Sequence, residues 1–447
     1  MGEIEIHDTA SGELLALRPH EPGKVGIYAC GPTVYSRIHI GNARPFVVFS
    51  LLARFLRHEG YEVKLVVNVT DVNDKIYDAA RARGVGSEQL AAEMTAAYFA
   101  DTDALGLGRP DAEPLASETI GPIEGYIQAL LDADHAYAVD GDVYFRVRSD
   151  ARYGSLSHRD PDSMDQGEGV EGADLKQDPL DFALWKAHKE GEDTSWQAAW
   201  GDGRPGWHIE CSAMAEEALP RGVDIHGGGS DLVFPHHENE ASQTRSARGH
   251  ELATIWMHNG MIQSTGEKMA KSVGNIAPLH EVIDGYGAEA VVMYLISGHY
   301  RQPLAFSEEA LEQAAANVRR IREAGRRLQA GEPSPAELAP LRERFFAALR
   351  RDFNTAEALA ALNEWLREAT QRSAGDGDLR EMLSVLGLES LLAPDAQAPA
   401  EVVELAEQRE RARSERDFAA ADELRDRIAA LGWEVRDGAQ GFELLPS

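Results

Sequence analysis

A strand–helix–strand unit near the start of the chain constrains the fold most strongly. Val25–Tyr28 is a short apolar segment and Val63–Asn68 is rich in β-branched residues, so both are predicted strands. Between them, Gly41–Arg57 carries apolar residues at helical spacing. Two strands joined through one helix lie parallel in a sheet, and ligands then bind at the C-terminal ends of the strands. The sequence therefore predicts the α/β class, with a Rossmann-like parallel sheet.

The remainder of the chain divides into an insertion and three further regions. The alternation of polar and apolar residues in Asp142–Val147 predicts a half-buried strand. The Asp- and Gly-rich segment Arg159–Gly172 predicts a surface loop. Beyond Ser307 the apolar spacing predicts successive helices, and the Ala/Pro-rich segment Ala393–Ala400 predicts a linker before a small final module. We therefore expect a Rossmann-like domain at 1–137 and 207–260, an inserted subdomain at 138–206, a connecting region at 261–310, an α-helical bundle at 311–392 and a C-terminal α+β module at 400–447.

Composition limits the class of protein without naming its partner. No apolar stretch approaches the roughly 20 residues that span a bilayer, and Met1–Arg18 lacks the basic-then-apolar pattern of a signal peptide. We therefore expect a cytoplasmic protein with no membrane partner. The net charge of −31 disfavours binding of nucleic acid to the surface as a whole, although an acidic enzyme can have local basic surfaces. The two cysteines, Cys30 and Cys211, are expected to be core residues or ligands rather than a disulfide.

The segment His39-Ile40-Gly41-Asn42 lies where the first strand leads into the first helix. The start of a helix presents free amides and a positive dipole end, which attract phosphate. Gly41 allows a ligand to approach the backbone, and His39 and Asn42 can donate hydrogen bonds to phosphate oxygens. A tetrapeptide of this kind also occurs by chance, so it is informative only beside a second motif.

The second motif is Lys268-Met269-Ala270-Lys271-Ser272, which lies between Gly266 and Gly274. Two lysines in a short loop flanked by glycines are suited to neutralise a pyrophosphate. A solvated basic turn is the alternative, and an isolated pair of lysines would favour it. Both motifs together, in this order and on an α/β frame, favour nucleotide chemistry.

The two motifs resemble the signature sequences of class I aminoacyl-tRNA synthetases. Their context resembles the cysteinyl-tRNA synthetase family in the segments Tyr28–Tyr35, Asn68–Lys75, Gly206–Met214 and His226–Glu240. The resemblance covers nearly the whole chain, with a looser match at Asp352–Thr355 and in the last module. It implies that the chain activates L-cysteine with ATP and transfers it to the 3′ end of tRNA(Cys). It also implies that 138–206 serves the acceptor end, that 261–310 contacts the stem and that 400–447 binds the anticodon.

The resemblance assigns the contacts with ATP to named residues, with Mg²⁺ accompanying the nucleotide. The residues implied for catalysis are His39, Asn42, Lys268 and Lys271, and those implied for ATP binding include Gly41, Gly228 and Asp231 as well. A tight turn is the alternative role for the glycines that follow His226. Two positions depart from the family pattern: Asn42 replaces the usual histidine of the signature, and Ala270 replaces the usual serine of the lysine loop. Because Asn42 still donates hydrogen bonds and both lysines remain, we expect altered rates rather than lost activity.

The resemblance also identifies a metal site that would select the substrate. Cys30, Cys211, His236 and Glu240 match the family's ligands for one Zn²⁺ ion, and zinc accepts this mixture of donors. Spacing alone would favour a buried cysteine pair beside a charged helix start, and His237 competes with His236 for the imidazole position. Cysteine and serine differ by one atom, so an ion that prefers thiolate to hydroxyl would separate them where an apolar pocket could not.

Further contacts with cysteine and tRNA follow from the same resemblance. Thr33, Thr70 and Trp207 are expected near the substrate cysteine, although a tryptophan is as often simply packed. The candidates for tRNA contact are Arg319, Arg322, Arg413, Arg416 and Trp433, the last of which is equally suited to core packing. Acidic residues interleave both arginine-rich stretches, so a solvated face is the alternative.

Two other functions share part of this pattern. One is a related enzyme that joins cysteine to an amino sugar, and the C-terminal 140 or so residues argue against it. The other is a catalytically silent RNA-binding paralogue, which would be expected to lose the lysine loop or the metal ligands. We expect a monomer by analogy with the family.

Overall fold

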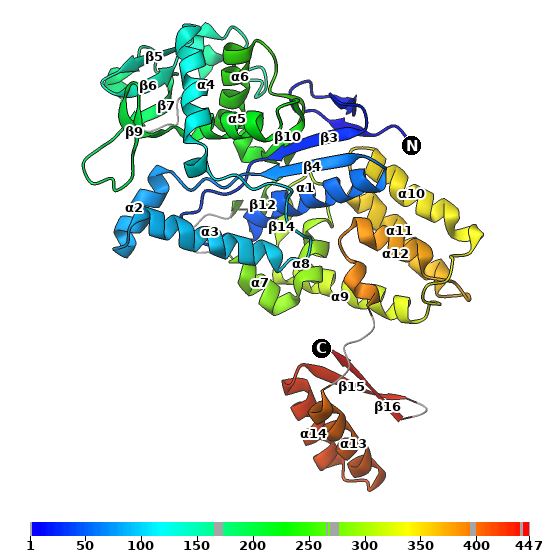
Figure 1. Cartoon of the computed structure of the whole chain (residues 1–447). Helices are drawn as coiled ribbons and strands as arrows, with labels where there is room; N and C mark the ends of the chain where they lie inside the picture. Colours follow the sequence, from blue (N-terminus) through cyan, green and yellow to red (C-terminus); the bar gives the residue numbers. More distant parts are fainter. Residues whose placement is uncertain are drawn as a thin grey trace. The chain divides into compact units, whose positions relative to one another are not determined.

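The computed structural model describes residues 2–164, 173–264, 267–268, 277–393, 399–438 and 441–446. The chain forms two compact units, Met1–Leu391 and Leu392–Ser447. Figure 1 shows the first unit as a mixed α/β body and the second as two helices with a β-hairpin.

The first unit is built around a parallel sheet of four strands in the order β11–β10–β3–β4. The strands are β3 (Lys24–Ala29), β4 (Glu62–Val67), β10 (Val223–Gly229) and β11 (Ala253–Asn259), and every neighbouring pair is parallel. Helix α1 (Ile40–His58) joins β3 to β4 and runs along one face of the sheet (Figure 1). The predicted α/β class with a Rossmann-like parallel sheet is therefore confirmed.

The insertion between β4 and β10 includes an antiparallel sheet of five strands. Its order is β5 (Ala136–Val139), β6 (Asp142–Phe145), β7 (Phe182–Ala187), β9 (Gly201–Pro205) and β8 (Trp196–Ala198). All four residues of β6 are buried, whereas the alternating sequence predicts a half-exposed strand. The reason is position: β6 lies between β5 and β7, and its one carboxylate, on Asp142, is satisfied by the backbone N–H of Ala187 and the hydroxyl of Tyr144.

Helices cover this sheet and connect it to the parallel sheet. Helix α4 (Ile120–Asp132) packs against α5 (Trp207–Ala218) and α6 (Glu238–Arg248). Phe145, Trp185 and Ile209 share one hydrophobic core with residues of α4. The insertion is therefore packed onto the two helices that follow it in the chain.

The helices predicted after Ser307 are all present. In the part of the first unit that the structure describes, the other α-helices and strands are β1 (Glu5–His7), β2 (Leu14–Ala16), α2 (Asp74–Arg83), α3 (Ser87–Asp103), β12 (Ile262–Ser264), β13 (Glu267–Lys268), α7 (Leu279–Tyr286), α8 (Ala288–Leu295), β14 (Leu304–Phe306), α9 (Glu308–Arg326), α10 (Ala339–Arg350), α11 (Thr355–Ala369) and α12 (Gly377–Val385). In the described part of the chain, no helix combines the length and the apolar character needed to span a bilayer.

The second unit has its own small core. Helices α13 (Ala400–Ser414) and α14 (Phe418–Ala430) pack on an antiparallel pair, β15 (Trp433–Gly438) and β16 (Gly441–Pro446). The core contains Val402, Leu405, Ile428 and Trp433.

A glycine in the middle of β10 allows the parallel sheet and α1 to approach each other. A Cβ atom added at Gly227 would overlap the carbonyl oxygen of Met257 on β11 and lie 2.5 Å from Cζ of Phe49 on α1. Neither neighbour can move freely, because Met257 belongs to the sheet backbone and the Phe49 side chain is fully buried. The backbone of Gly227 is therefore in direct contact with both layers.

We predict that Gly227→Ala destabilises the protein by about 3 kcal/mol or more, because the new methyl group overpacks this layer. The matched control is Gly125→Ala, at an exposed position within α4 where a Cβ meets nothing within 4 Å. The control should stabilise the protein by about 1 kcal/mol, since alanine favours the helix over glycine. Chemical denaturation measures both changes, and equal stabilities of the two variants would contradict the packing described here.

Candidate active site and metal cluster

The first turn of α1 forms a reciprocal cap from two of the predicted site residues. His39 lies before the helix in an extended conformation, and its Nδ1 accepts a hydrogen bond from the N–H of Gly41 at 3.1 Å. The Oδ1 of Asn42 accepts in return from the N–H of His39 at 3.2 Å. Asn42 therefore serves as the return partner of a capping box, a role usually taken by Glu or Gln. Its amide group remains a donor, and a neutral His39 that accepts at Nδ1 carries its proton on Nε2.

A cleft of about 290 Å³ opens in front of this turn. It lies where the C-terminal ends of β3, β10 and β11 meet the start of α1, as expected for a parallel sheet. Its lining includes seven predicted site residues: Cys30, Thr33, His39, Gly41, Asn42, Trp207 and Asp231.

Two predicted residues lie behind the lining of the cleft. Thr70 is buried and pairs with Thr33 in an isolated β-bridge. Gly228 is buried, and a Cβ added there would lie 2.9 Å from Leu232 and 3.7 Å from Cys30. Asn259–Met261 also line the cleft and were not predicted, because their only signal in the sequence is a glycine at the end of an apolar strand.

The four predicted metal ligands converge at one buried point beside the cleft. Their donor atoms, two Sγ, one imidazole nitrogen and one carboxylate oxygen, lie within 4.8 Å of one another. The Sγ atoms of Cys30 and Cys211 are 3.8 Å apart, and Nε2 of His236 is 2.9 Å from Oε1 of Glu240. Two thiolates about 2.3 Å from a tetrahedral zinc ion would lie about 3.8 Å apart, so the donors and their spacing fit this metal.

A second set of donors overlaps the first. Cys30 and Glu240 also group with His226 and His237, and Nε2 of His237 lies 3.3 Å from Sγ of Cys30. The Nδ1 of His237 contacts Nε2 of His258 at 2.7 Å. The structure therefore brings both candidate histidines to the cluster, but only the set with His236 contains both cysteines.

Buried charges in the cluster prepare it to receive a cation. Burial by itself would raise the pKa of Glu240, but His236 and His226 outweigh this effect and hold the pKa well below its usual range. His226 contacts the other carboxylate oxygen of Glu240 at 2.7 Å. The hydrogen bond from Cys30 lowers the pKa of Cys211 to about 6, while burial raises the pKa of Cys30. The cluster thus favours one thiolate and one carboxylate at neutral pH.

Trp207 connects the cluster with the cleft. Its ring stacks on that of His236, with the centroids 4.1 Å apart and the planes at 19°, while Trp207 also lines the cleft. In addition, Nδ1 of His236 is 2.8 Å from Nδ1 of His208. The orientation of His236 is therefore fixed by two neighbours from α5.

Comparison with known proteins identifies the family. Residues 16–316 match the family described as tRNA synthetases class I (C) catalytic domain, and residues 395–443 match the cysteinyl-tRNA ligase anticodon binding domain. The chain is 45% identical to a cysteine–tRNA ligase of Halorhodospira halophila, over 98% of each chain, and 41% identical to one of Caldicellulosiruptor saccharolyticus, over 99% of each.

The chain belongs to the cysteinyl-tRNA synthetase family.

Solved structures with low sequence identity share the fold of this synthetase. A methionyl-tRNA synthetase of Mycobacterium tuberculosis superposes with a TM-score of 0.61 at 18% identity, covering 81% of this chain and 88% of the other. A leucyl enzyme, agnB2 LeuRS of Agrobacterium radiobacter K84, gives a TM-score of 0.58 at 12% identity, covering 84% and 83%. These comparisons support the class I fold.

The remaining predicted residues of the synthetase are placed only in part. Lys268 lies in β13, whose backbone pairs with Gln263 of β12, whereas Lys271 lies outside the described residues. Arg319 is exposed on α9, while Arg322 of the same helix lies 3.9 Å from Glu289.

In the second unit, Arg413 lies on α13 and Arg416 follows in a left-handed turn with φ of 63°. Trp433 is 8% exposed and packs in the core, which is the packing alternative raised by the sequence.

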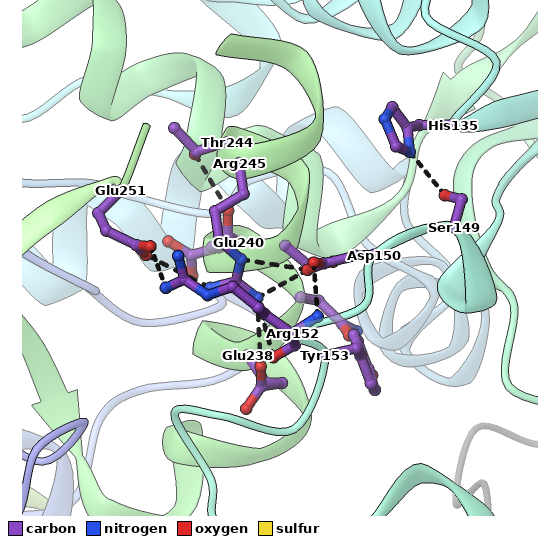
Figure 2. A network of polar contacts seen from close by, with 12 residues as sticks. His135, Ser149, Asp150, Arg152, Tyr153, Glu238, Glu240, Thr244, Arg245 and Glu251 are labelled. Atoms are coloured by element: carbon purple, nitrogen blue, oxygen red, sulfur yellow. Dashed lines mark hydrogen bonds and ion pairs between the residues drawn. The ribbon is translucent and has the colours of Figure 1, made fainter. Parts of the chain in front are cut away.

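A network of polar contacts anchors α6, the helix that carries Glu240 (Figure 2). Arg245 donates to Asp150 of the insertion at 2.7 Å and lies 3.7 Å from Glu238. Ser242 also donates to Asp150, at 2.7 Å. Burial raises the pKa of Asp150, but its bonds to Arg245 and Ser242 outweigh this and lower the pKa overall. The insertion therefore helps to set the position of α6, and with it that of Glu240.

We predict that Arg245→Met costs about 3–5 kcal/mol of stability, because it leaves the carboxylate of Asp150 buried and unpaired. The side chains of Arg245 and Asp150 are only 9% and 8% exposed. The control is Arg248→Met on the same helix, which removes a more exposed contact with Glu216 and should cost no more than about 1 kcal/mol. Urea denaturation measures the free energy of unfolding of both variants. A similar loss in both would show that the buried Arg245–Asp150 pair stabilises the protein no more than the exposed Arg248–Glu216 pair.

Proposed function

We propose that this chain activates L-cysteine with ATP and transfers it to the 3′ end of tRNA(Cys), with a zinc ion selecting the substrate thiolate. The observation that carries the proposal is the buried Cys30, Cys211, His236 and Glu240 cluster beside a cleft at the start of α1. Full-length relatives named cysteine–tRNA ligase support the same reaction. A monomer in the cytoplasm is part of this proposal.

We assign the four zinc ligands to Cys30, Cys211, His236 and Glu240. This set is favoured over the one with His237 because it includes both thiolates, which are ligands that zinc prefers. Bound zinc would supply a preference for sulfur over a neutral hydroxyl, which is the one difference between cysteine and serine. Because four protein ligands would make a closed site, the substrate sulfur would have to bind as an additional or exchanging ligand. Cys30 is the ligand that lines the cleft, so the substrate would approach from its side.

The cleft residues are proposed to hold ATP and the rest of the amino acid. The start of α1, with Gly41 and the donors of His39 and Asn42, would bind phosphate. The turn that contains Gly228 and Asp231 would approach the adenosine. Thr33, Thr70 and Trp207 would surround the cysteine, and Trp207 has the direct contact with His236.

The reaction would proceed in two steps that need no covalent attachment to the protein. The carboxylate of cysteine attacks the α-phosphorus of ATP in line and releases pyrophosphate. Lys268 and Lys271 would neutralise the charge that develops on the phosphates, and Mg²⁺ would accompany ATP. A ribose hydroxyl at the tRNA 3′ end then attacks the acyl carbon and releases AMP. Catalysis of this kind depends on positioning and charge stabilisation.

The regions beyond the catalytic domain are proposed to bind tRNA. We assign 138–206 to the acceptor end and 261–310 to the stem. The helical bundle at 311–392 and the module at 400–447 are assigned to the anticodon-binding part. Arg319, Arg322, Arg413 and Arg416 are the proposed phosphate contacts. A match to the anticodon binding domain at residues 395–443 favours this function over ligation of cysteine to an amino sugar, which requires no such module.

We predict that Cys211→Ser removes bound zinc and cysteine-dependent ATP–pyrophosphate exchange together. Metal analysis by mass spectrometry and the exchange assay, run with cysteine and with serine, measure the two properties. A variant that loses stability yet still activates cysteine would refute the selecting role of the metal.

His237→Gln is the matched comparison for His236→Gln. We expect His236→Gln to abolish zinc binding, because it removes a ligand. His237→Gln should keep the ion with an affinity lowered by about 10- to 100-fold, as is typical for residues that contact a ligand. The reverse order of the two effects would transfer the ligand assignment to His237.

We predict that removal of residues after 395 damages tRNA charging far more than ATP–pyrophosphate exchange. The cut falls shortly after Leu391, the last residue of the first compact unit, so this unit keeps its own core. Exchange should stay within about 3-fold of the full chain, and charging should fall by at least about 100-fold. Equal loss in both assays would refute the division of labour.

A further inference from the structure

We propose that Arg44 is a positioning residue that sets the distance between two walls of the ATP-binding cleft. The inference rests on the proposed function and deepens it, because it names a residue that acts on the nucleotide site without touching the nucleotide. Arg44 lies one turn into α1, and its side chain is completely buried.

The guanidinium group of Arg44 bonds three backbone carbonyls from two separate segments. Its Nη1 donates to the carbonyl oxygens of Gly260 at 2.5 Å and Gln302 at 2.8 Å. Its Nη2 donates to the carbonyl oxygen of His299 at 3.2 Å. Among the described residues no carboxylate pairs with Arg44, and burial lowers its pKa to about 10, so it stays charged at neutral pH.

These carbonyls belong to two segments that contact each other, Gly260 and residues 299–302, and we call this contact the joint. Strand β13, which contains Lys268, follows shortly after Gly260 in the chain. Gly260 directly follows β11 and lines the cleft, and its N–H donates to the carbonyl oxygen of Tyr300 at 2.8 Å. A Cβ at Gly260 would overlap the backbone of Gln302, so the two segments are in direct contact. Immediately beyond the joint, β12 pairs with β14 and with β13, the strand that contains Lys268.

Arg44 thus joins two parts of the cleft lining that are far apart in the sequence. The first is the start of α1, with His39, Gly41 and Asn42, and the second is Asn259–Met261. Helix α1 also packs against β12, near which it lies in Figure 1. Because α1 would hold the phosphates and β13 contains Lys268, the separation of these elements decides whether both sets of contacts form at once.

The choice of arginine argues for precise positioning over simple packing. A buried cation without an anionic partner is costly, and an apolar side chain of similar volume would pack a helix at lower cost. Arginine instead offers five donors in a rigid planar fork, which can hold several carbonyls in fixed relative positions. Lysine keeps the positive charge but lacks the planar fork of donors. Arg44→Lys therefore tests whether the geometry of the hydrogen bonds matters when the charge is unchanged.

The experiment compares Arg44→Lys with Arg54→Lys, a matched variant ten residues later on the same helix. Arg54 also bonds backbone carbonyls, those of Leu107 and Ser384, but it contacts no part of the cleft. Steady-state ATP–pyrophosphate exchange gives kcat and the KM values for ATP and cysteine. Zinc content, the dissociation constant of ATP and the thermal midpoint are measured on the same preparations.

We expect Arg44→Lys to lower kcat for exchange by about 100-fold, which is the effect of displacing reacting groups by about 1 Å. The KM for cysteine and the zinc content should change by less than about 2-fold, because the metal cluster lies on other elements. Arg54→Lys should leave kcat within about 2-fold of the parent even if its thermal midpoint falls equally. Gly260→Ala, which displaces Gln302 from the other side of the joint, should reproduce the loss of kcat with Arg44 intact.

Several results would overturn the proposal. These are an unchanged kcat in Arg44→Lys, an equal loss in Arg54→Lys, or a rise in the KM for cysteine that matches the loss of kcat. If Arg44→Lys does not fold, normal exchange by Gly260→Ala would likewise overturn it. If the parent protein binds ATP but does not exchange with cysteine, the proposed function fails. The positioning role then stands if Arg44→Lys weakens ATP binding about 10-fold relative to Arg54→Lys, and fails if it does not.

Discussion

The parallel pairing of β10 with β3 and β11 is the constraint on which the site depends. In this register Ile225 lies opposite Ile27 on one side and Ile255 on the other, so all three strands end at the same edge. Cys30 directly follows β3, the glycines at the end of β10 lie beside it, and Asn259 is the last residue of β11. A shift of the register would separate these ends, and the cleft and the metal cluster would both lose their lining.

The cluster beside this edge places several ionisable groups where water does not reach. Such groups would be strongly destabilising alone, but here each carboxylate oxygen of Glu240 has an imidazole partner and the two sulfurs share a proton. The donor set is compatible with zinc, because thiolate, imidazole and carboxylate are all ligands of that ion. Polar contacts from Asp150 of the insertion to α6 hold the arrangement, so the insertion supports the site although its strands contribute none of the four donors.

The sequence predicted the fold class and most of the candidate site because both have local signals. The βαβ unit follows from the change between apolar runs and helical spacing within a short stretch, and the observed α1 begins within one residue of the predicted helix. The exposure of β6 was predicted wrongly, because alternation in one strand does not show that strands lie on both sides of it. Asn42 looked like a weakened phosphate contact, whereas the structure shows that it also caps the helix.

The sequence by itself determined the kinds of chemical group available: two thiols, several histidines, a helix start suited to phosphate, and a lysine loop. Tertiary structure alone decided which of them meet. Cys30 and Cys211 are 181 residues apart, and only the register of the sheet and the packing of α5 bring their sulfurs to 3.8 Å. The partners of Arg44 are backbone carbonyls, which every residue possesses, so no side-chain pattern could have indicated them. Distances between segments remote in the chain are set by the packing of whole elements, and that information is not local to any motif.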